Sequence, residues 1–555
     1  MEEKKIDINS IIGFILIFGI LMWIMYQNEP TPQEKLDIAN REKQAAVQAT
    51  KASVASPISA STTGEIVTTS FGTGTEQAVA NNGSTVLENE LVILTIANKG
   101  GYIIDAKLKK FEKTKKGSGE LVSIIKDNNA SLSLKLSLKD GRVLDTKNVF
   151  FEPTVLKNST GTILKMKFKA TETSFLEYQY TLKPADYMVG FDVTSANLDA
   201  VLNTSKPADL EWSMKTFRNE KSISYENRYT EMYFGHEAGK ADYLGQSHDD
   251  TETPTAVDYV AFKQHFFTSI LLTDKPFASS TLYSTNLVND EKKDTIFTKQ
   301  FRANLPLTFT NGALSHKMHW FYGPSDYKTL NAYDKNLEKT VALGWGIFGW
   351  INRHVFIPTF DFISGFMGIG LAIIIFTVLV KLLMSPVTYK SFLSQAKMKV
   401  LRPDIAELGE KFKKDPMKKQ QETMKLYNKA GVNPMAGCIP ALIQMPVFYA
   451  LFQFFPAAIA LRHQNFLWAD DLSSYDAVFK LPFTIPGYGN HVSLFPILAS
   501  IAIFFYMKMT TGDQQMQAPQ QEGMPDMGKI MKIMIYVSPL MMLFFFNNYA
   551  AGLSL

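Results

Sequence analysis

Lys381 is the residue whose chemistry stands out, because its charge directly follows the apolar segment 362–380. A charged side chain at the middle of a bilayer costs about 2.5 to 3.5 kcal/mol on insertion scales, so such a residue is a candidate functional group. Lys381 also lies five residues before Pro386, and its long side chain could instead reach the aqueous interface. The spacing leaves both interpretations open.

Polar side chains on two apolar segments could line a water-accessible groove together with this charge. Thr377 lies in the same segment as Lys381, and Gln444 and Gln453 lie in the segment 440–461. The same side chains could equally form hydrogen bonds between helices.

Common catalytic motifs such as H-E-x-x-H, G-x-x-x-x-G-K-[ST] and G-x-S-x-G do not occur in the chain. The closest pair among the eight histidines, His316 and His319, lies in an alternating segment where both could face solvent. The single cysteine, Cys438, excludes an intramolecular disulfide and a cysteine-based zinc cluster. We therefore expect a protein that is no enzyme and needs neither cofactor nor metal.

The charge distribution predicts the topology of the chain. Residues 381–430 contain 12 Lys and Arg and 5 Asp and Glu, a net charge of +7, although the whole chain carries only +4. By the positive-inside rule this loop is cytoplasmic. Counting along the chain then places the N-terminus and residues 508–532 inside, and the large polar region and residues 463–490 outside.

The basic loop itself predicts a helical hairpin over residues 399–431. Pro403 can open the first helix, and Asp415-Pro416 supplies an N-cap and first residue for a second helix that ends before Gly431. Its lysines either form a solvated face that signals topology or dock an incoming substrate or an anionic partner such as ribosomal RNA. The candidate contact residues are Lys411, Lys413, Lys414, Lys418 and Lys419.

Apolar segments predict about five to six transmembrane helices. Residues 11–26 contain no charge, so we expect an uncleaved signal anchor over 1–26. The later segments are 362–380, 440–461, 492–507 and 533–546. The last two would span only about 24 and 21 Å, which either indicates a locally thinned bilayer or means that these boundaries are wrong by a few residues.

Between the anchor and the later spans, the sequence predicts a linker and a large all-β sandwich. Residues 27–87 are rich in Ala, Ser and Thr without apolar periodicity, as is typical of a flexible tether. Residues 88–325 alternate with a period of two, for example at Leu132, Leu134 and Leu136, and Asp140-Gly141 is a hairpin signal.

Residues 326–355 predict an amphipathic helix, charged at first and then apolar, that lies in the bilayer interface. Alternatively, it is an ordinary helix packed on the sandwich. Residues 356–555 then form the membrane core. A fresh apolar run begins at Ala550, so we expect the last helix to be incomplete.

The run N-P-x-x-G-C-x-P-x-L-I-Q-M-P-x-F within residues 431–452 resembles the YidC/Oxa/Alb family of membrane protein insertases. The preceding residues 384–405 resemble the segment that leads into the cytoplasmic hairpin of that family. The anchor, the tether, the outer sandwich and the interfacial helix extend the resemblance over nearly the whole chain. This arrangement is the one typical of the family in Gram-negative bacteria.

The resemblance implies an insertase and folding chaperone without ATP or covalent chemistry. Its core encloses a hydrophilic groove, open to the cytoplasm and the lipid, whose positive charge receives the polar tail of a nascent protein. That charge falls on Lys381, where most bacterial relatives have arginine, and lysine lacks the planar bidentate fork of arginine. Met445 and Phe448 fall where the family contacts substrate helices.

The resemblance also implies the partners and the place of action. The partners are nascent membrane proteins, the ribosome, the Sec translocon and lipids, and no specific nucleic-acid sequence is recognised. The protein then lies in the bacterial inner membrane, with the sandwich in the periplasm. Two other hypotheses remain: a small-solute transporter, for which we see no internal repeats, and a membrane-anchored carbohydrate-binding module, which rests on fold analogy alone.

Overall fold

The computed structural model describes residues 82–171, 173–237, 239–245, 248–291, 293–413, 415–431, 439–485, 488–511 and 527–555. All of these residues belong to one compact unit of the chain. The expected anchor over 1–26, nearly all of the expected linker, Lys414 and Cys438 lie outside the described residues. Strand β1 starts at Ser84, a few residues before the expected domain boundary at 88.

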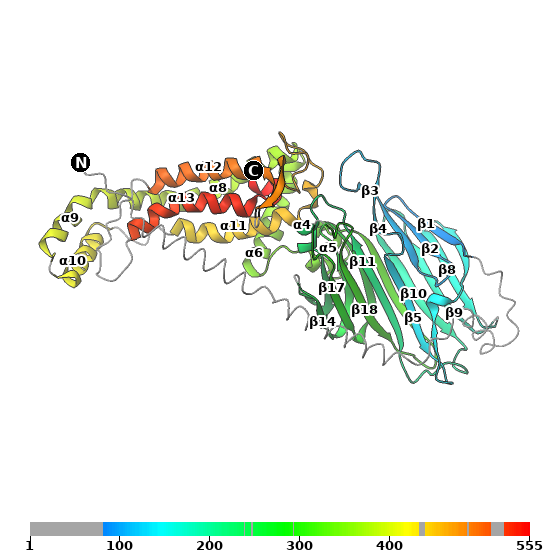
Figure 1. Ribbon diagram of the computed structural model, residues 1–555. Helices are drawn as coiled ribbons and strands as arrows, with labels where there is room; N and C mark the ends of the chain where they lie inside the picture. Colours follow the sequence, from blue (N-terminus) through cyan, green and yellow to red (C-terminus); the bar gives the residue numbers. More distant parts are fainter. Residues whose placement is uncertain are drawn as a thin grey trace, which may run out of the picture. The chain divides into compact units, whose positions relative to one another are not determined.

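Antiparallel sheets make up the first part of the described chain (Figure 1). The four-stranded sheet has the order β1 (Ser84–Glu88), β2 (Val92–Ala97), β3 (Ile103–Glu112), β4 (Leu121–Ile125). The six-stranded sheet has the order β14 (Asp250–Glu252), β17 (Thr281–Asn286), β18 (Phe297–Leu307), β11 (Ala208–Phe217), β5 (Ala130–Ser137), β6 (Val143–Asp145). The nine-stranded sheet has the order β13 (Lys240–Tyr243), β12 (Glu231–His236), β15 (Thr255–Lys263), β16 (Phe267–Ser279), β19 (Ser315–Pro324), β10 (Met188–Ala196), β9 (Phe175–Leu182), β8 (Gly161–Lys169), β7 (Glu152–Asn158). Two short helices, η1 (Thr146–Asn148) and α4 (Ile223–Arg228), interrupt the strands.

The alternation in the sequence is confirmed as the pattern of a sandwich. Leu132, Leu134 and Leu136 of β5 are buried, because alternate residues of a strand point to the same face. The expected hairpin at Asp140 is present: β5 pairs with β6, and Gly141 adopts a φ of +87°, a left-handed backbone that glycine favours.

Aromatic side chains join the two larger sheets of the sandwich. Trp212 of β11 stacks on Phe262 of β15 with ring centroids 3.6 Å apart, and it meets Trp320 of β19 edge-on at 4.9 Å. Both tryptophans are 2% exposed. Large buried rings of this kind contribute most of the hydrophobic stabilisation of a core.

The segment after the sandwich is divided into short helices and is not the single helix expected over 326–355. The left-handed backbone at Asn336 (φ +58°) and Gly344 (φ +85°) interrupts the helix, because an α-helix requires negative φ. Trp345 and Trp350 are exposed. The helices are α5 (Tyr327–Asn331), η2 (Leu337–Thr340), α6 (Gly346–Ile351), the π-helical turn η3 (Asn352–Phe356) and α7 (Ile357–Ser364).

Long apolar helices follow, lying alongside one another in Figure 1. The expected segment 362–380 is corrected: α7 ends at Ser364 and α8 begins at Ile369, with Gly365 and Gly368 in the break. The remaining elements are α8 (Ile369–Val400), α9 (Arg402–Lys411), α10 (Pro416–Lys429), α11 (Ile439–Ala457), η5 (Ile459–Leu461), β20 (Ala477–Ile485), β21 (Gly489–Ser493), α12 (Leu494–Thr511), α13 (Met527–Phe546) and α14 (Ala551–Ser554).

Phenylalanines form the core of this helical region. Phe376 of α8 lies edge-on to Phe356 at 5.2 Å, and Phe454 of α11 lies edge-on to Phe360 at 5.4 Å. Among the described helices, only α8 is long and apolar enough to cross a membrane, over Ile369–Met398. The apolar parts of three others are shorter: Leu442–Ala457, Leu494–Met509 and Ile533–Phe546.

Candidate functional site

Lys381 and Gln444 meet across two helices. The ammonium Nζ of Lys381, on α8, donates a hydrogen bond of 3.1 Å to Oε1 of Gln444 on α11. The two residues are 63 positions apart in the chain, so the fold brings them together. Helix α8 does not end near Pro386 but continues to Val400, and Lys381 therefore lies well inside a long helix.

The two other polar candidates bond within their own helices. The hydroxyl of Thr377 donates to the carbonyl of Ile373 at 2.9 Å, and the amide of Gln453 donates to the hydroxyl of Tyr449 at 3.1 Å. Thr377 precedes Lys381 by four residues and so lies on the same side of α8. Thr377 can therefore border the Lys381–Gln444 pair, whereas Gln453 lies nine residues, or about 14 Å, further along α11.

Met445 and Phe448 present apolar surface beside this pair. Met445 is 64% exposed and Phe448 is 42% exposed, and both belong to α11. Residues three and four apart are neighbours on a helix surface, so Phe448 lies one turn from Gln444. One helix thus carries both a polar contact to Lys381 and an exposed apolar surface.

The basic segment contains two helices, α9 (Arg402–Lys411) and α10 (Pro416–Lys429). Helices α9 and α10 meet at Asp415, whose carboxylate accepts from the backbone N–H of Lys418 at 3.1 Å. The ammonium groups of Lys411 and Lys418 lie 5.9 and 5.7 Å from the ring centre of Phe412. Lys413 pairs with the exposed Glu410 at 3.6 Å, and Lys419 approaches Gly409. These four lysines are therefore held close to the turn that joins the two helices.

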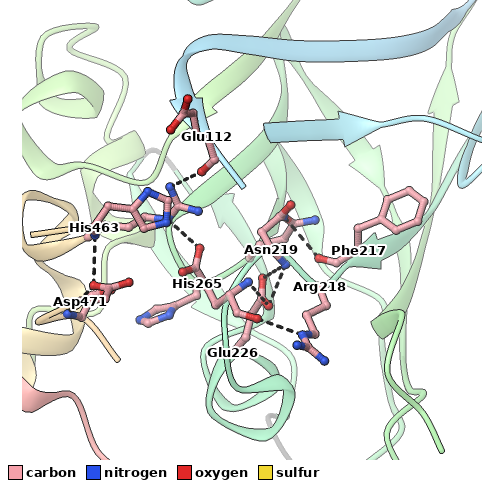
Figure 2. A network of polar contacts seen from close by, with 12 residues as sticks. Glu112, Phe217, Arg218, Asn219, Glu226, His265, His463 and Asp471 are labelled. Atoms are coloured by element: carbon pink, nitrogen blue, oxygen red, sulfur yellow. Dashed lines mark hydrogen bonds and ion pairs between the residues drawn. The ribbon is translucent and has the colours of Figure 1, made fainter. Parts of the chain in front are cut away.

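Sequence reasoning missed a buried polar cluster that links the sandwich to the helical region. The guanidinium of Arg462, just after η5, donates to Oε1 of Glu220 at 2.7 Å and to the carbonyl of Glu112 at 2.7 Å. Figure 2 shows His265, Glu226 and Asn219 around these contacts. The signal available was weak: a single arginine that follows the apolar run ending at Leu461.

Asp476 organises the start of α12, which the sequence did not reveal either. Its Oδ2 accepts from the backbone N–H groups of Leu494 and Phe495 at 3.0 and 2.9 Å, and from the indole N–H of Trp468 at 2.8 Å. The first N–H groups of a helix have no partner within the helix. Asp476 therefore caps α12 from a distant position in the chain.

These features define a protein class: a large β-sandwich followed by apolar helices, with a lysine–glutamine pair between two of them. Family models match both parts, the YidC periplasmic domain over residues 84–358 and the 60Kd inner membrane protein over residues 361–555. The chain belongs to the YidC family of membrane protein insertases, as the signature in residues 431–452 predicts.

Two relatives of known name agree with this assignment. The chain is 35% identical over 581 residues to the membrane protein insertase YidC of Parabacteroides distasonis, which covers 99% of this chain and 89% of the relative. It is 35% identical over 565 residues to that of Bacteroides fragilis, covering 99% and 88%. A crystal structure of an active YidC insertase with its first transmembrane domain resolved is 17% identical, covers 86% of this chain and 90% of that chain, and superposes with a TM-score of 0.30.

The sandwich is thus the periplasmic domain of the family, and the names of the relatives support an insertase function.

Proposed function

We propose that this chain inserts nascent integral membrane proteins into the bacterial inner membrane and assists their folding, with Lys381 as the group that receives their polar segments. The observation that carries the proposal is the contact of Lys381 with Gln444 between α8 and α11. No bond is made or broken in this task. The protein only lowers the free-energy cost of moving a hydrated segment through hydrocarbon.

The Lys381–Gln444 contact suits a site that exchanges partners. Gln444 gives the ammonium a neutral acceptor at 3.1 Å, so the charge is not left without a hydrogen bond. A carboxylate in the polar tail of a substrate would form a charge-assisted bond, which is about twice as strong as a neutral one. An acidic tail therefore displaces Gln444, and the freed amide can bond to the substrate backbone.

Apolar substrate segments would leave this groove over α11. Met445 and Phe448 are exposed on that helix, and methionine adapts to partners of different shape because its side chain is flexible and polarisable. A substrate helix that slides over these side chains stays close to the polar pair. The same helix would thus handle both the polar and the apolar parts of a client.

The proposal includes the topology expected from the charges: a cytoplasmic N-terminus, five to six transmembrane helices and a cytoplasmic hairpin over 399–431. The apolar parts of α12 and α13, Leu494–Met509 and Ile533–Phe546, have lengths of about 24 and 21 Å, against about 30 Å of hydrocarbon. A bilayer thinned around them lowers the barrier to translocation. The hairpin lysines then face the ribosome, and the Sec translocon is a partner for some clients.

Substitutions at Lys381 test the proposal in a strain depleted of its own insertase and in proteoliposomes. Lys381→Gln removes the charge but keeps a hydrogen-bonding side chain, and it should lower insertion of a substrate with an acidic translocated tail at least about tenfold. Lys381→Arg should retain most activity. Lys390→Ala, at an exposed position of the same helix, is the matched control. Normal insertion by Lys381→Gln would exclude the proposed role of the charge.

A further inference from the structure

The outer end of α11 is built with fewer backbone hydrogen bonds than an ordinary helix. Pro456 lies inside α11, and a proline removes the bond from its own nitrogen to the carbonyl four residues earlier, here that of Phe452. The last four carbonyls of any helix also lack partners within the helix. The segment from Phe452 to Ala457 therefore depends on contacts from outside α11.

Contacts with α11 come from two other parts of the chain. The side-chain amide of Asn352 donates to the carbonyl of Ala450 at 2.9 Å. Nε2 of His265, in the turn between β15 and β16 of the sandwich, lies 2.9 Å from the carbonyl of Pro456. Burial lowers the pKa of His265 to about 3, so the imidazole is neutral and donates its Nε2–H to this carbonyl. A residue of the sandwich thus caps the C-terminus of α11.

Arg462 fixes the chain immediately after this helix. Its guanidinium bonds to Glu220 and to the carbonyl of Glu112, and it lies 5.1 Å from the ring centre of Phe267. The side chains of Arg462 and Glu220 are 3% and 8% exposed. A buried ion pair with these additional contacts has little freedom to shift, since separating it would leave two charges without water or partner.

The sandwich also contacts the segments that precede α12 and follow α13. Nζ of Lys221 donates to the carbonyl of Tyr475 at 3.1 Å, and Nη1 of Arg228 donates to the hydroxyl of Tyr549 at 2.9 Å. These residues precede α12 and follow α13. Of the sandwich contacts named here, those of His265 and Arg462 are the ones made with α11 and with the turn that follows it.

We propose that His265 and Arg462 are positioning residues for the groove, which hold the outer end of α11 so that Gln444 stays opposite Lys381. The expected effect on insertion rests on the proposed function. The position of α11 relative to α8 can be tested independently of that function. Gln444 lies 12 residues before Pro456, a distance of about 18 Å along the helix. A displacement of the outer end is passed along α11 and separates Gln444 from Lys381.

A distance measurement tests the positioning directly in the full chain. Spin labels at Tyr389→Cys on α8 and Leu442→Cys on α11, both exposed positions, are introduced with Cys438→Ser and measured by pulsed electron paramagnetic resonance in nanodiscs. We expect one narrow distance distribution, which His265→Phe and Arg462→Gln shift or broaden. His265→Phe keeps the aromatic ring but removes the donor. Lys221→Met is the matched control, because it breaks the sandwich contact with the carbonyl of Tyr475 ahead of α12, and it should leave the distribution unchanged.

A double-mutant cycle tests the consequence for insertion. Arg462→Gln should lower insertion of an acidic-tail substrate at least about fivefold, the lower end of typical coupling between sites. In a Gln444→Ala background the same change should have little further effect, because the residue it positions is absent. A merely structural loss would lower insertion equally in both backgrounds. Arg462→Lys keeps the charge and should restore part of the activity.

The outcomes separate the two proposals. Unchanged spin-label distances in both His265→Phe and Arg462→Gln would overturn the positioning role, whatever the activity. A shifted distance together with normal insertion by Lys381→Gln would instead support positioning and refute the role of the lysine. Equal losses in the two backgrounds of the cycle would also overturn the inference, since they show that Arg462 does not act through Gln444.

Discussion

The carboxylate of Glu226 accepts the backbone N–H of Asn219 with both oxygens, at 2.9 and 3.1 Å. It also accepts the N–H of Glu220 at 3.0 Å, and it is 1% exposed. Burial, and then the neighbouring charge of Glu220, raises the pKa of Glu226 to about 8. Arg462 and the backbone bonds act in the opposite direction but do not compensate for the lost hydration.

Glu226 should make the protein less stable as the pH rises. The folded chain keeps a proton on this carboxyl that the unfolded chain releases near its ordinary pKa of 4.5. Its contribution is therefore complete below pH 4.5 and is lost as the pH rises through about 8, by at most about 1.4 kcal/mol per pH unit. Thermal unfolding of the purified full chain from pH 6.5 to 8.5 should show a falling Tm, and Glu226→Gln should flatten this dependence. An equally steep curve for Glu226→Gln would contradict the assignment.

His265 should make the protein less stable as the pH falls into the acidic range. Burial lowers its pKa from 6.5 to about 3, so the unfolded chain takes up a proton that the folded chain refuses. The stabilising contribution of the neutral imidazole is present above pH 6.5 and is lost as the pH falls through the range down to about 3. His265→Phe should remove this acidic loss of Tm. Thermal unfolding of the full chain from pH 6.5 down to about pH 4 measures this loss, with His354→Phe as a control at an exposed histidine.

The sandwich could be predicted from the sequence because its signal is local. Leu132, Leu134 and Leu136 alternate within one strand, and the side chains of a strand alternate between its two faces. The limits of the apolar helices were less accurate, since apolar content does not show where a helix breaks: residues 362–364 belong to α7 and those from Ile369 to α8.

The polar cluster at Arg462 could not be predicted from local pattern. Glu220 and Arg462 are 242 residues apart, and neither lies in a motif that names its partner. The sequence places Lys381 and Gln444 as candidates for one groove, although spacing alone also allows Lys381 to reach the interface. Only the tertiary structure brings their side chains within hydrogen-bonding distance.

Gly349 should tolerate no side chain. A Cβ at this position would lie 2.2 Å from the carbonyl oxygen of Gly344, a backbone atom that cannot move away without unwinding the turn into α6. Gly349→Ala should therefore destabilise this segment by about 1 to 3 kcal/mol and lower the yield of folded protein in membranes. Gly368→Ala is the matched control, because nothing lies within 4 Å of its Cβ. Equal yields and equal Tm values for the two variants would show that α6 can shift to make room.

Asp476 should stabilise the first turn of α12. Its carboxylate bonds to the N–H groups of both Leu494 and Phe495, and replacing a capping residue by alanine typically costs about 0.5 to 2 kcal/mol. Asp476→Ala should therefore speed amide hydrogen exchange at these two residues, with little change in the sandwich. Asp476→Asn keeps an acceptor oxygen but loses the negative charge that favours a helix N-terminus, so its exchange rates should lie between those of the parent chain and the alanine variant. If the two variants exchange equally fast, the charge and not the hydrogen bond is what holds the start of α12.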